Sequence, residues 1–169
     1  MNIICLDIDD CIFPSNVNYF GRTEDALEVF KINLKRLKMI IEKYNFKLFM
    51  TSSWYSLYDL KEGSLVLKDR REIDIDKEVN AAHSLIMHYI RDDFIGLSEG
   101  DRKQDIVSLL QMENIEKMIV LDDWDLSEEC NLSKRSHFIP MFGFVDGNVG
   151  FIIDKFMKTG QKVLRRSYY

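Results

Sequence analysis

The segment that decides the fold is IICLDIDD, residues 3–10. Its first four residues are apolar without interruption, which is typical of a strand buried on both faces, as in a parallel sheet covered by helices. The apolar run stops at Asp7, and Asp9 and Asp10 follow directly. The segment therefore predicts a buried strand that ends at a group of carboxylates.

Two later apolar runs also end at polar side chains. The first is Phe46–Met50, before Thr51, Ser52 and Ser53, and the second is Met118–Leu121, before Asp122 and Asp123. Between the first two runs, Glu24–Tyr44 carries apolar residues mostly at steps of three and four, which predicts a long amphipathic helix. Alternation of strand and helix is typical of an α/β fold with parallel crossovers. We therefore expect a central parallel sheet with helices on both faces.

The remaining segments give weaker patterns. Further helices are predicted at Trp54–Leu60, Val79–Ile90, Lys103–Met112 and Phe151–Met157. The segment Lys61–Lys77 is charged and has no clear periodicity, so we interpret it as an irregular insertion. His137–Phe144 is predicted to be a fourth strand, which Pro140 breaks or places at a sheet edge.

Composition narrows the class of protein. The chain has 169 residues, 46% of them hydrophobic, which is enough for one core, so residues 1–169 are predicted to form a single domain. A net charge of −5 argues against nucleic-acid binding by bulk electrostatics, although it permits local recognition of a phosphate. No signal peptide or membrane span is expected.

The three cysteines are Cys5, Cys11 and Cys130, and they form no CxxC unit. A disulfide framework and a thiolate zinc site are therefore not expected, and we predict a reducing, cytoplasmic location.

The polar residues at the strand ends suggest a site. In open parallel sheets the functional crevice lies at the carboxyl ends of the strands. Carboxylates that meet there repel one another unless a cation neutralises them, and an all-oxygen set of ligands suits Mg²⁺. Asp7 and Asp9 could then act as nucleophile and proton donor, with Lys103 neutralising the transferred group. This combination favours phosphoryl transfer.

Four segments make the hypothesis more specific. In chain order they are LDIDDCIF (6–13), LFMTSSW (48–54), Arg102-Lys103 before an amphipathic helix, and IVLDDWD (119–125). Together they resemble the four motifs of the haloacid dehalogenase (HAD) superfamily of phosphatases. TSSW and the later FVDGNVGF (144–151) resemble more narrowly the HAD domains associated with RNA-repair proteins. The resemblance implies a three-layer, Rossmann-like α/β fold.

The resemblance also implies a role for each matching residue. Asp7 would attack phosphorus, and Asp9 would protonate the leaving oxygen and later activate water. The implied Mg²⁺ ligands are Asp7, the backbone carbonyl of Asp9 and Asp123, with Asp122 as a further ligand or a neighbouring acceptor. The phosphoryl group would be bound by Thr51 and Lys103, with Ser52 beside them.

The chain departs from the family pattern after Asp9. The family often has Gly-Thr or Gly-Val there, whereas this chain has Asp10 and Cys11, and Asp10 could disturb the loop or add charge. Arg102 or Lys77 could also take the place of Lys103.

The other residues that could bind a metal, a substrate or a nucleic acid are predicted to have ordinary structural roles. His83 and His88 do not have metal-binding spacing and are predicted to lie at the surface or to be partly packed. Cys11 is interpreted as a small loop residue rather than a nucleophile. The basic, aromatic tail that contains Lys162, Arg165 and Arg166 is more typical of a frayed terminus than of a nucleic-acid contact.

The sequence thus predicts a Mg²⁺-dependent phosphatase with an aspartyl-phosphate intermediate. The short intervals between motifs leave little room for a cap domain, so we expect an open site and a bulky substrate, first of all a phosphorylated RNA or DNA end. A phosphoprotein or a nucleotide is the next choice of substrate. A non-catalytic metal- and phosphate-binding module and a metal-dependent nuclease are the alternatives to a phosphatase. No membrane association and no obligate protein partner are expected.

Overall fold

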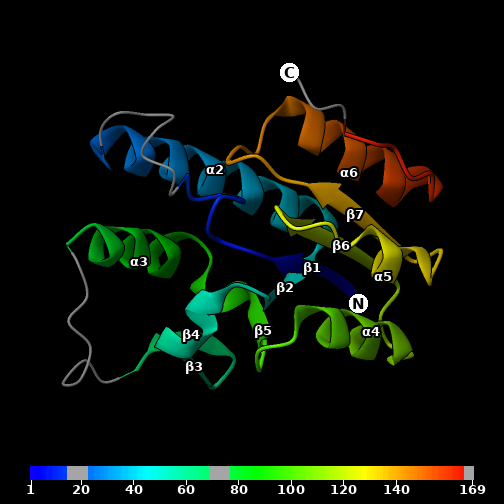
Figure 1. Ribbon diagram of the computed structural model, residues 1–169, viewed down its shortest axis with the longest axis horizontal. Coiled ribbons are helices and arrows are strands. Elements are labelled where there is room, and N and C mark those ends of the chain that lie inside the picture. Colours follow the sequence, from blue (N-terminus) through cyan, green and yellow to red (C-terminus); the bar gives the residue numbers. More distant parts are fainter. Residues whose placement is uncertain (15–22, 69–76, 166–169) are drawn as a thin grey trace.

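The computed structural model describes residues 1–14, 23–68 and 77–165. Five strands form one parallel sheet in the order β5-β2-β1-β6-β7 (Figure 1). They are β1 (Asn2–Leu6), β2 (Phe46–Met50), β5 (Phe94–Leu97), β6 (Lys117–Asp122) and β7 (Ser136–Pro140). The strand order reverses between β1 and β6, and in open parallel sheets such a switch point is where ligands bind, at the carboxyl ends of the strands.

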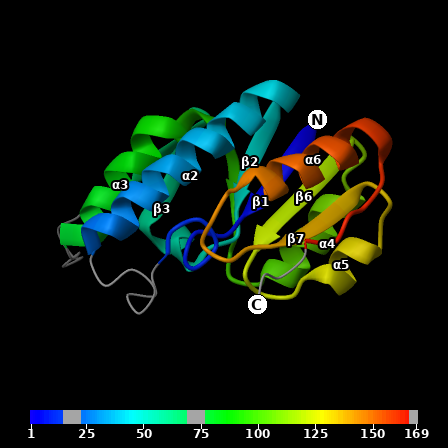
Figure 2. The same cartoon turned by 90° about the horizontal axis from the view of Figure 1, so that it is seen from above.

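Helices cover both faces of this sheet (Figures 1 and 2). Ile4 and Leu6 of β1 pack in one core with the helices α2 (Thr23–Tyr44), α3 (Lys77–Tyr89) and α6 (Gly147–Thr159). Ile3 and Cys5 pack in a second core with α4 (Arg102–Gln111) and α5 (Ser127–Asn131). Successive side chains of a strand point to opposite faces, so one apolar strand serves both cores. The predicted three-layer α/β fold is confirmed.

The central strand is in register with both neighbours. Leu6 pairs with Met50 of β2 and with Leu121 of β6. Beyond these pairs, the amide of Asp7 donates to the carbonyl of Leu121 at 3.0 Å. The amide of Thr51 donates to the carbonyl of Leu6 at 2.9 Å. The register therefore aligns the carboxyl ends of three strands.

The segment after β2 differs from the prediction. Instead of a helix over Trp54–Leu60, a 3₁₀ turn, η1 (Ser53–Leu57), leads into an antiparallel hairpin of β3 (Tyr58–Lys61) and β4 (Ser64–Leu67). Glu62 and Gly63 form its turn with φ of 52° and 79°, the left-handed values that tight hairpin turns require. The predicted irregular insertion therefore contains a strand, and its residues 69–76 lie outside the described residues.

Three other boundaries depend on tertiary contacts. The four-residue strand β5 was not predicted, because such a short run has no distinctive period. The strand β7 is shorter than His137–Phe144 and ends at Pro140, on the edge of the sheet. The helix α6 begins at Gly147 rather than Phe151, since the Asp146 side chain caps it by accepting from the Val149 amide at 2.9 Å. The predicted helices 24–44, 79–90 and 103–112 are confirmed.

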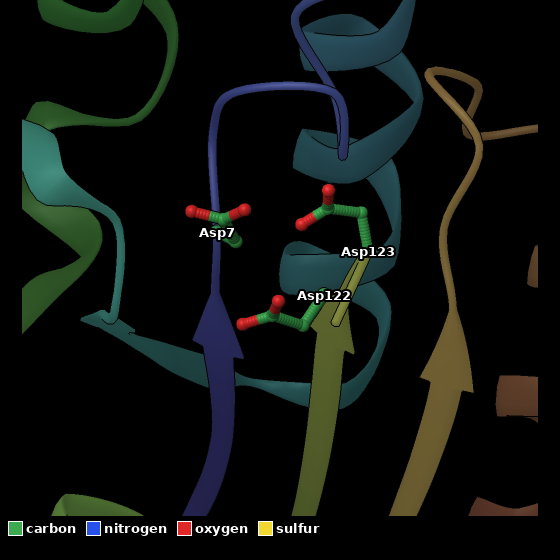
Figure 3. Close-up of side chains that lie close together, drawn as sticks. All are labelled: Asp7, Asp122 and Asp123. Carbon is green, nitrogen blue, oxygen red and sulfur yellow. The ribbon is translucent and has the colours of Figure 1, made fainter. Parts of the chain in front are cut away.

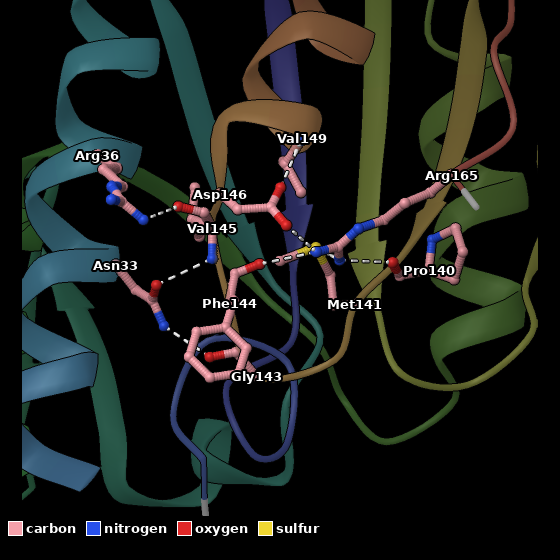
Figure 4. A network of polar contacts seen from close by, with 10 residues as sticks. All are labelled: Asn33, Arg36, Pro140, Met141, Gly143, Phe144, Val145, Asp146, Val149 and Arg165. Atoms are coloured by element: carbon pink, nitrogen blue, oxygen red, sulfur yellow. Dashed lines mark hydrogen bonds and ion pairs between the residues drawn. The ribbon is translucent and has the colours of Figure 1, made fainter. Parts of the chain in front are cut away.

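Asn33 of α2 joins the loop after β1 to the loop after β7, and Figure 4 shows its contacts with Gly143 and Val145 of the second loop. Its buried amide donates to the carbonyls of Ile12 and Gly143 at 2.7 and 2.8 Å, and its oxygen accepts from the Val145 amide at 2.9 Å. All the hydrogen-bonding groups involved are thereby satisfied away from water. Asn33 thus anchors the loop that carries Asp9.

The C-terminal segment packs back on the sheet edge. Lys162 donates to the carbonyls of Cys130 and Ser133. Arg165 donates to the Pro140 carbonyl at 3.0 Å and to Asp146 Oδ2 at 2.9 Å (Figure 4). The interpretation of a frayed terminus is therefore wrong for Lys162 and Arg165, and residues 166–169 lie outside the described residues. Within the described ranges, no helix has the length and apolarity needed to cross a membrane.

Candidate active site

Three aspartates meet at the carboxyl end of the sheet (Figure 3). Asp7 follows β1, Asp122 ends β6, and Asp123 comes next along the chain. One carboxylate oxygen from each lies within 4.8 Å of the other two. Asp7 and Asp122 are 1% and 0% exposed, whereas Asp123 is exposed. The structure thus brings together the three side chains that were predicted to surround a metal.

Strand alternation explains the orientation of the two buried carboxylates. Cys5 and Val120 face the core beneath α4. Asp7 and Asp122 each lie two residues further along the same strands, and therefore on the same side of the sheet. The helix α4 begins at this place, with its first residue, Arg102, directed at both carboxylates. Arg102 Nη1 lies 2.8 Å from Asp122 Oδ1 and 3.5 Å from Asp7 Oδ2.

Lys103 does not lie at this site, and its predicted position is wrong. Its Nζ lies 3.0 Å from Glu129 Oε1 of α5, and its side chain lines a pocket between α4 and α5. Consecutive helical residues differ by about 100° in direction, so only one of Arg102 and Lys103 can face the carboxylates. Arg102, which the sequence offered as an alternative to Lys103, is the cation that faces the carboxylates. Lys77 begins α3.

Burial destabilises the charged forms of Asp7 and Asp122, and the charge of Arg102 offsets only part of this effect. Burial, together with the negative charge of Asp122, raises the pKa of Asp7 to about 8, although Arg102 opposes this effect. Burial also raises the pKa of Asp122, against the hydrogen bond from the Trp124 amide and the charge of Arg102. One arginine therefore does not fully stabilise two desolvated carboxylates.

Three oxygen atoms at the site lack a hydrogen-bond partner among the described residues. They are Asp7 Oδ1, Asp122 Oδ2 and Thr51 Oγ1, all on buried side chains. Buried polar atoms normally have partners, so these atoms indicate a ligand. Hard oxygen donors and excess negative charge fit Mg²⁺. The residues present thus match the cation that the sequence predicted.

Thr51 and Ser52 have different surroundings. Thr51 is 2% exposed and follows β2 directly beside β1. The hydroxyl of Ser52 accepts from the Trp54 amide at 3.4 Å and so caps η1. The Thr51 hydroxyl therefore has no hydrogen-bond partner among the described residues, whereas the Ser52 hydroxyl is used within this turn.

Asp9 stands apart from the three clustered carboxylates. Its Oδ2 accepts a hydrogen bond from Trp54 Nε1 at 2.9 Å. Burial raises its pKa, and the hydrogen bond from Trp54 acts in the opposite direction. A raised pKa suits a carboxyl group that must carry a proton. In the sequence, Trp54 belongs to a motif and to the start of a predicted helix, and no local pattern indicates this contact with Asp9.

Asp10 occupies a position that requires an unusual backbone. Its φ is 52°, in the left-handed region that favours glycine, and its amide donates to the Phe13 carbonyl at 2.8 Å. Aspartate and asparagine tolerate this conformation best after glycine, at a cost of roughly 1–2 kcal/mol. The departure from the family's glycine therefore leaves a closed turn that an aspartate can adopt.

Two neighbouring residues are buried. Cys11 is fully buried, and burial raises the pKa of its thiol, which agrees with the interpretation of a loop residue rather than a nucleophile. His83 is also fully buried and contacts the Tyr58 hydroxyl, so its expected surface or partly packed position is wrong. The hairpin that supplies Tyr58 was not apparent from the sequence.

Comparison with known proteins gives one family. A family model described as the HAD domain in Swiss Army Knife RNA repair proteins matches residues 3–151, which include all four motifs. No curated protein and no solved structure matches the chain.

The raised pKa of Asp7 makes the stability of the metal-free protein depend on pH. Between the ordinary pKa of 3.8 and the folded value of about 8, the folded state keeps a proton that the unfolded state releases. The free energy of unfolding in EDTA should therefore fall by several kcal/mol as pH rises through this window. Asp7→Asn should flatten this dependence, and millimolar Mg²⁺ should stabilise the wild type at pH 8 more than the variant.

Urea unfolding at a series of pH values, with and without Mg²⁺, measures these effects. Glu113→Gln, which alters an exposed carboxylate away from the site, should behave as the wild type. An equal pH slope and equal Mg²⁺ response in the wild type and Asp7→Asn would contradict the assignment.

Proposed function

This chain belongs to the family of HAD domains in Swiss Army Knife RNA repair proteins, and on that premise we propose that it is a Mg²⁺-dependent phosphatase with Asp7 as its nucleophile. The observation that carries the proposal is the buried Asp7 carboxylate, which lies 3.5 Å from Arg102 and has one oxygen without a partner among the described residues. A desolvated carboxylate beside a fixed cation is suited to attack on a phosphate.

The proposed reaction has two displacements at phosphorus. First, an oxygen of Asp7 forms a bond to phosphorus while the bond to the leaving oxygen breaks, and Asp9 gives its proton to that oxygen. Next, water attacks the aspartyl-phosphate, Asp9 takes a proton from the water, and the bond from Asp7 to phosphorus breaks. The products are an alcohol and inorganic phosphate, and both carboxyl groups return to their starting states.

Other residues would stabilise the transferred group. Arg102 is positioned to neutralise charge on the phosphoryl oxygens, and Thr51 has a buried hydroxyl available to donate to one of them. Asp7, Asp123 and the backbone carbonyl of Asp9 would hold Mg²⁺, which when bound neutralises the carboxylates and polarises the phosphate. Asp122 would then orient Arg102, through their 2.8 Å contact.

A phosphorylated nucleic-acid end is the substrate we propose. The family description refers to RNA repair. At the site, Trp124 follows Asp123 directly and is 63% exposed. The guanidinium carbon of Arg102 lies 4.7 Å from the centre of its ring. An exposed aromatic ring beside a phosphate site provides a surface on which a terminal base can stack.

A substrate panel tests the activity. With Mg²⁺, the wild type should release phosphate from 5′- or 3′-phosphorylated RNA or DNA faster than from phosphopeptides or nucleoside monophosphates. Asp7→Asn should lower kcat by about 10³-fold or more, since the nucleophile is lost, and EDTA should stop release. A colorimetric phosphate assay measures both.

Circular dichroism checks that Asp7→Asn keeps the fold. Turnover retained by the folded variant would exclude Asp7 as the nucleophile. Cleavage of unmodified strands without release of terminal phosphate would instead favour a nuclease.

Arg102 and Lys103 form a matched pair of neighbouring cations. Arg102→Ala should lower kcat/KM by about 100-fold, because the transition state loses a fixed positive charge. Lys103→Ala should change it by less than about twofold, because the ion pair that it loses, with Glu129 of α5, lies away from the three clustered carboxylates. Steady-state kinetics compares them, and Arg102→Lys controls for the loss of charge at a buried site. A larger loss of kcat/KM in Lys103→Ala than in Arg102→Ala would show that Lys103, rather than Arg102, acts on the transferred group.

The stacking role of Trp124 can be tested with a double-mutant cycle. Removing the terminal base from a phosphorylated oligonucleotide should lower wild-type kcat/KM by about tenfold, within the usual range for stacking. In Trp124→Ala, removing the terminal base should have almost no effect on kcat/KM. In Trp124→Phe, removing the base should still lower kcat/KM by most of the wild-type factor. Independent, additive effects of the base and the side chain would show that Trp124 does not stack on the base.

A further inference from the structure

We propose that Trp54 is a positioning residue for Asp9, and that its indole N–H fixes the carboxyl group for proton transfer to the leaving oxygen. The inference rests on the proposed function, in which Asp9 is the general acid. It assigns a role in that reaction to a side chain from the turn after β2.

The contact between the two side chains is direct. Trp54 Nε1 donates to Asp9 Oδ2 at 2.9 Å. An indole has a single hydrogen-bond donor and no acceptor, and Trp54 is only 8% exposed. The single polar group of the Trp54 side chain is therefore hydrogen-bonded to the carboxyl group of Asp9.

Two aromatic side chains contact the indole ring, and a third supports one of them. Phe13, from the loop after β1, meets it edge to face with ring centres 5.9 Å apart. His83 of α3 lies 4.8 Å from it between ring centres. His83 is in turn contacted by the Tyr58 hydroxyl of β3. The ring thus packs against the loop after β1 and against α3, whose His83 is itself contacted by the hairpin, and this packing restricts the orientation of the ring.

Asp9 needs such support because of where it lies. It is half-buried in the loop after β1, beyond the strand that holds Asp7 rigidly. A carboxyl group on a loop can turn about two side-chain bonds, and proton transfer tolerates little misplacement. With Oδ2 held as the acceptor of the indole N–H, Oδ1 is the oxygen left to carry the proton.

The role predicts a dependence on the leaving group. An alkoxide leaving group needs a proton as the bond to phosphorus breaks, whereas a dinitrophenolate leaves without one. Trp54→Phe keeps an aromatic ring but removes the N–H. It should lower kcat/KM for an alkyl phosphate by about tenfold or more, and that for dinitrophenyl phosphate by less than about threefold. The parameter kcat/KM is suitable because it reports the first displacement.

Matched variants separate positioning from folding. Asp9→Asn should give the same pattern with a larger effect, and Tyr55→Phe, in the same turn, should behave as the wild type with both esters. If Trp54→Phe does not fold, as judged by circular dichroism, the benzothienyl analogue at position 54 replaces the N–H with sulfur at nearly constant shape.

Each outcome is informative. A selective loss with the alkyl ester supports the positioning role. An active wild type together with an equal loss for both esters, or with no loss, overturns the inference and leaves the proposed function intact. A wild type that releases phosphate from neither ester overturns the proposed function, and the inference with it.

Discussion

The hydrogen-bonded register of β1 between β2 and β6 is the constraint on which the rest of the structure depends. Because Leu6 pairs with both Met50 and Leu121, the residues that follow in all three strands meet at one edge. Parallel pairing fixes this alignment through backbone groups alone, so the site gains its geometry from the most buried part of the sheet. A shift of one residue would turn Asp7 toward the opposite core.

The same register creates an electrostatic conflict that the fold does not remove. Asp7 and Asp122 are both buried, and Arg102 contacts both of them. One positive charge against two carboxylates leaves excess negative charge in a poorly hydrated place. A site of this kind is less stable without a cation, and the same instability would favour the binding of Mg²⁺ and phosphate that we propose. Stability and proposed function thus oppose each other at the same atoms.

The segment between β2 and α4 shapes the region around Asp9. The turn η1 presents Trp54, and the hairpin and α3 supply Tyr58 and His83 behind it. The sequence predicted α3 but not the hairpin, because a short hairpin with a Glu-Gly turn carries a weak signal in a charged segment. The burial of His83 could not be predicted, since it depends on a strand whose presence was missed.

The sequence by itself determined the α/β class, the strands that end at Asp7, Thr51 and Asp122, and the order of the four motifs, because each depends on local apolar runs and the polar residues after them. Only the tertiary structure decided which side chains meet. Arg102 rather than Lys103 faces the carboxylates because successive residues of α4 point in different directions from a helix that is fixed against the sheet. The contact between Trp54 and Asp9 spans two loops, and no local pattern encodes such a meeting.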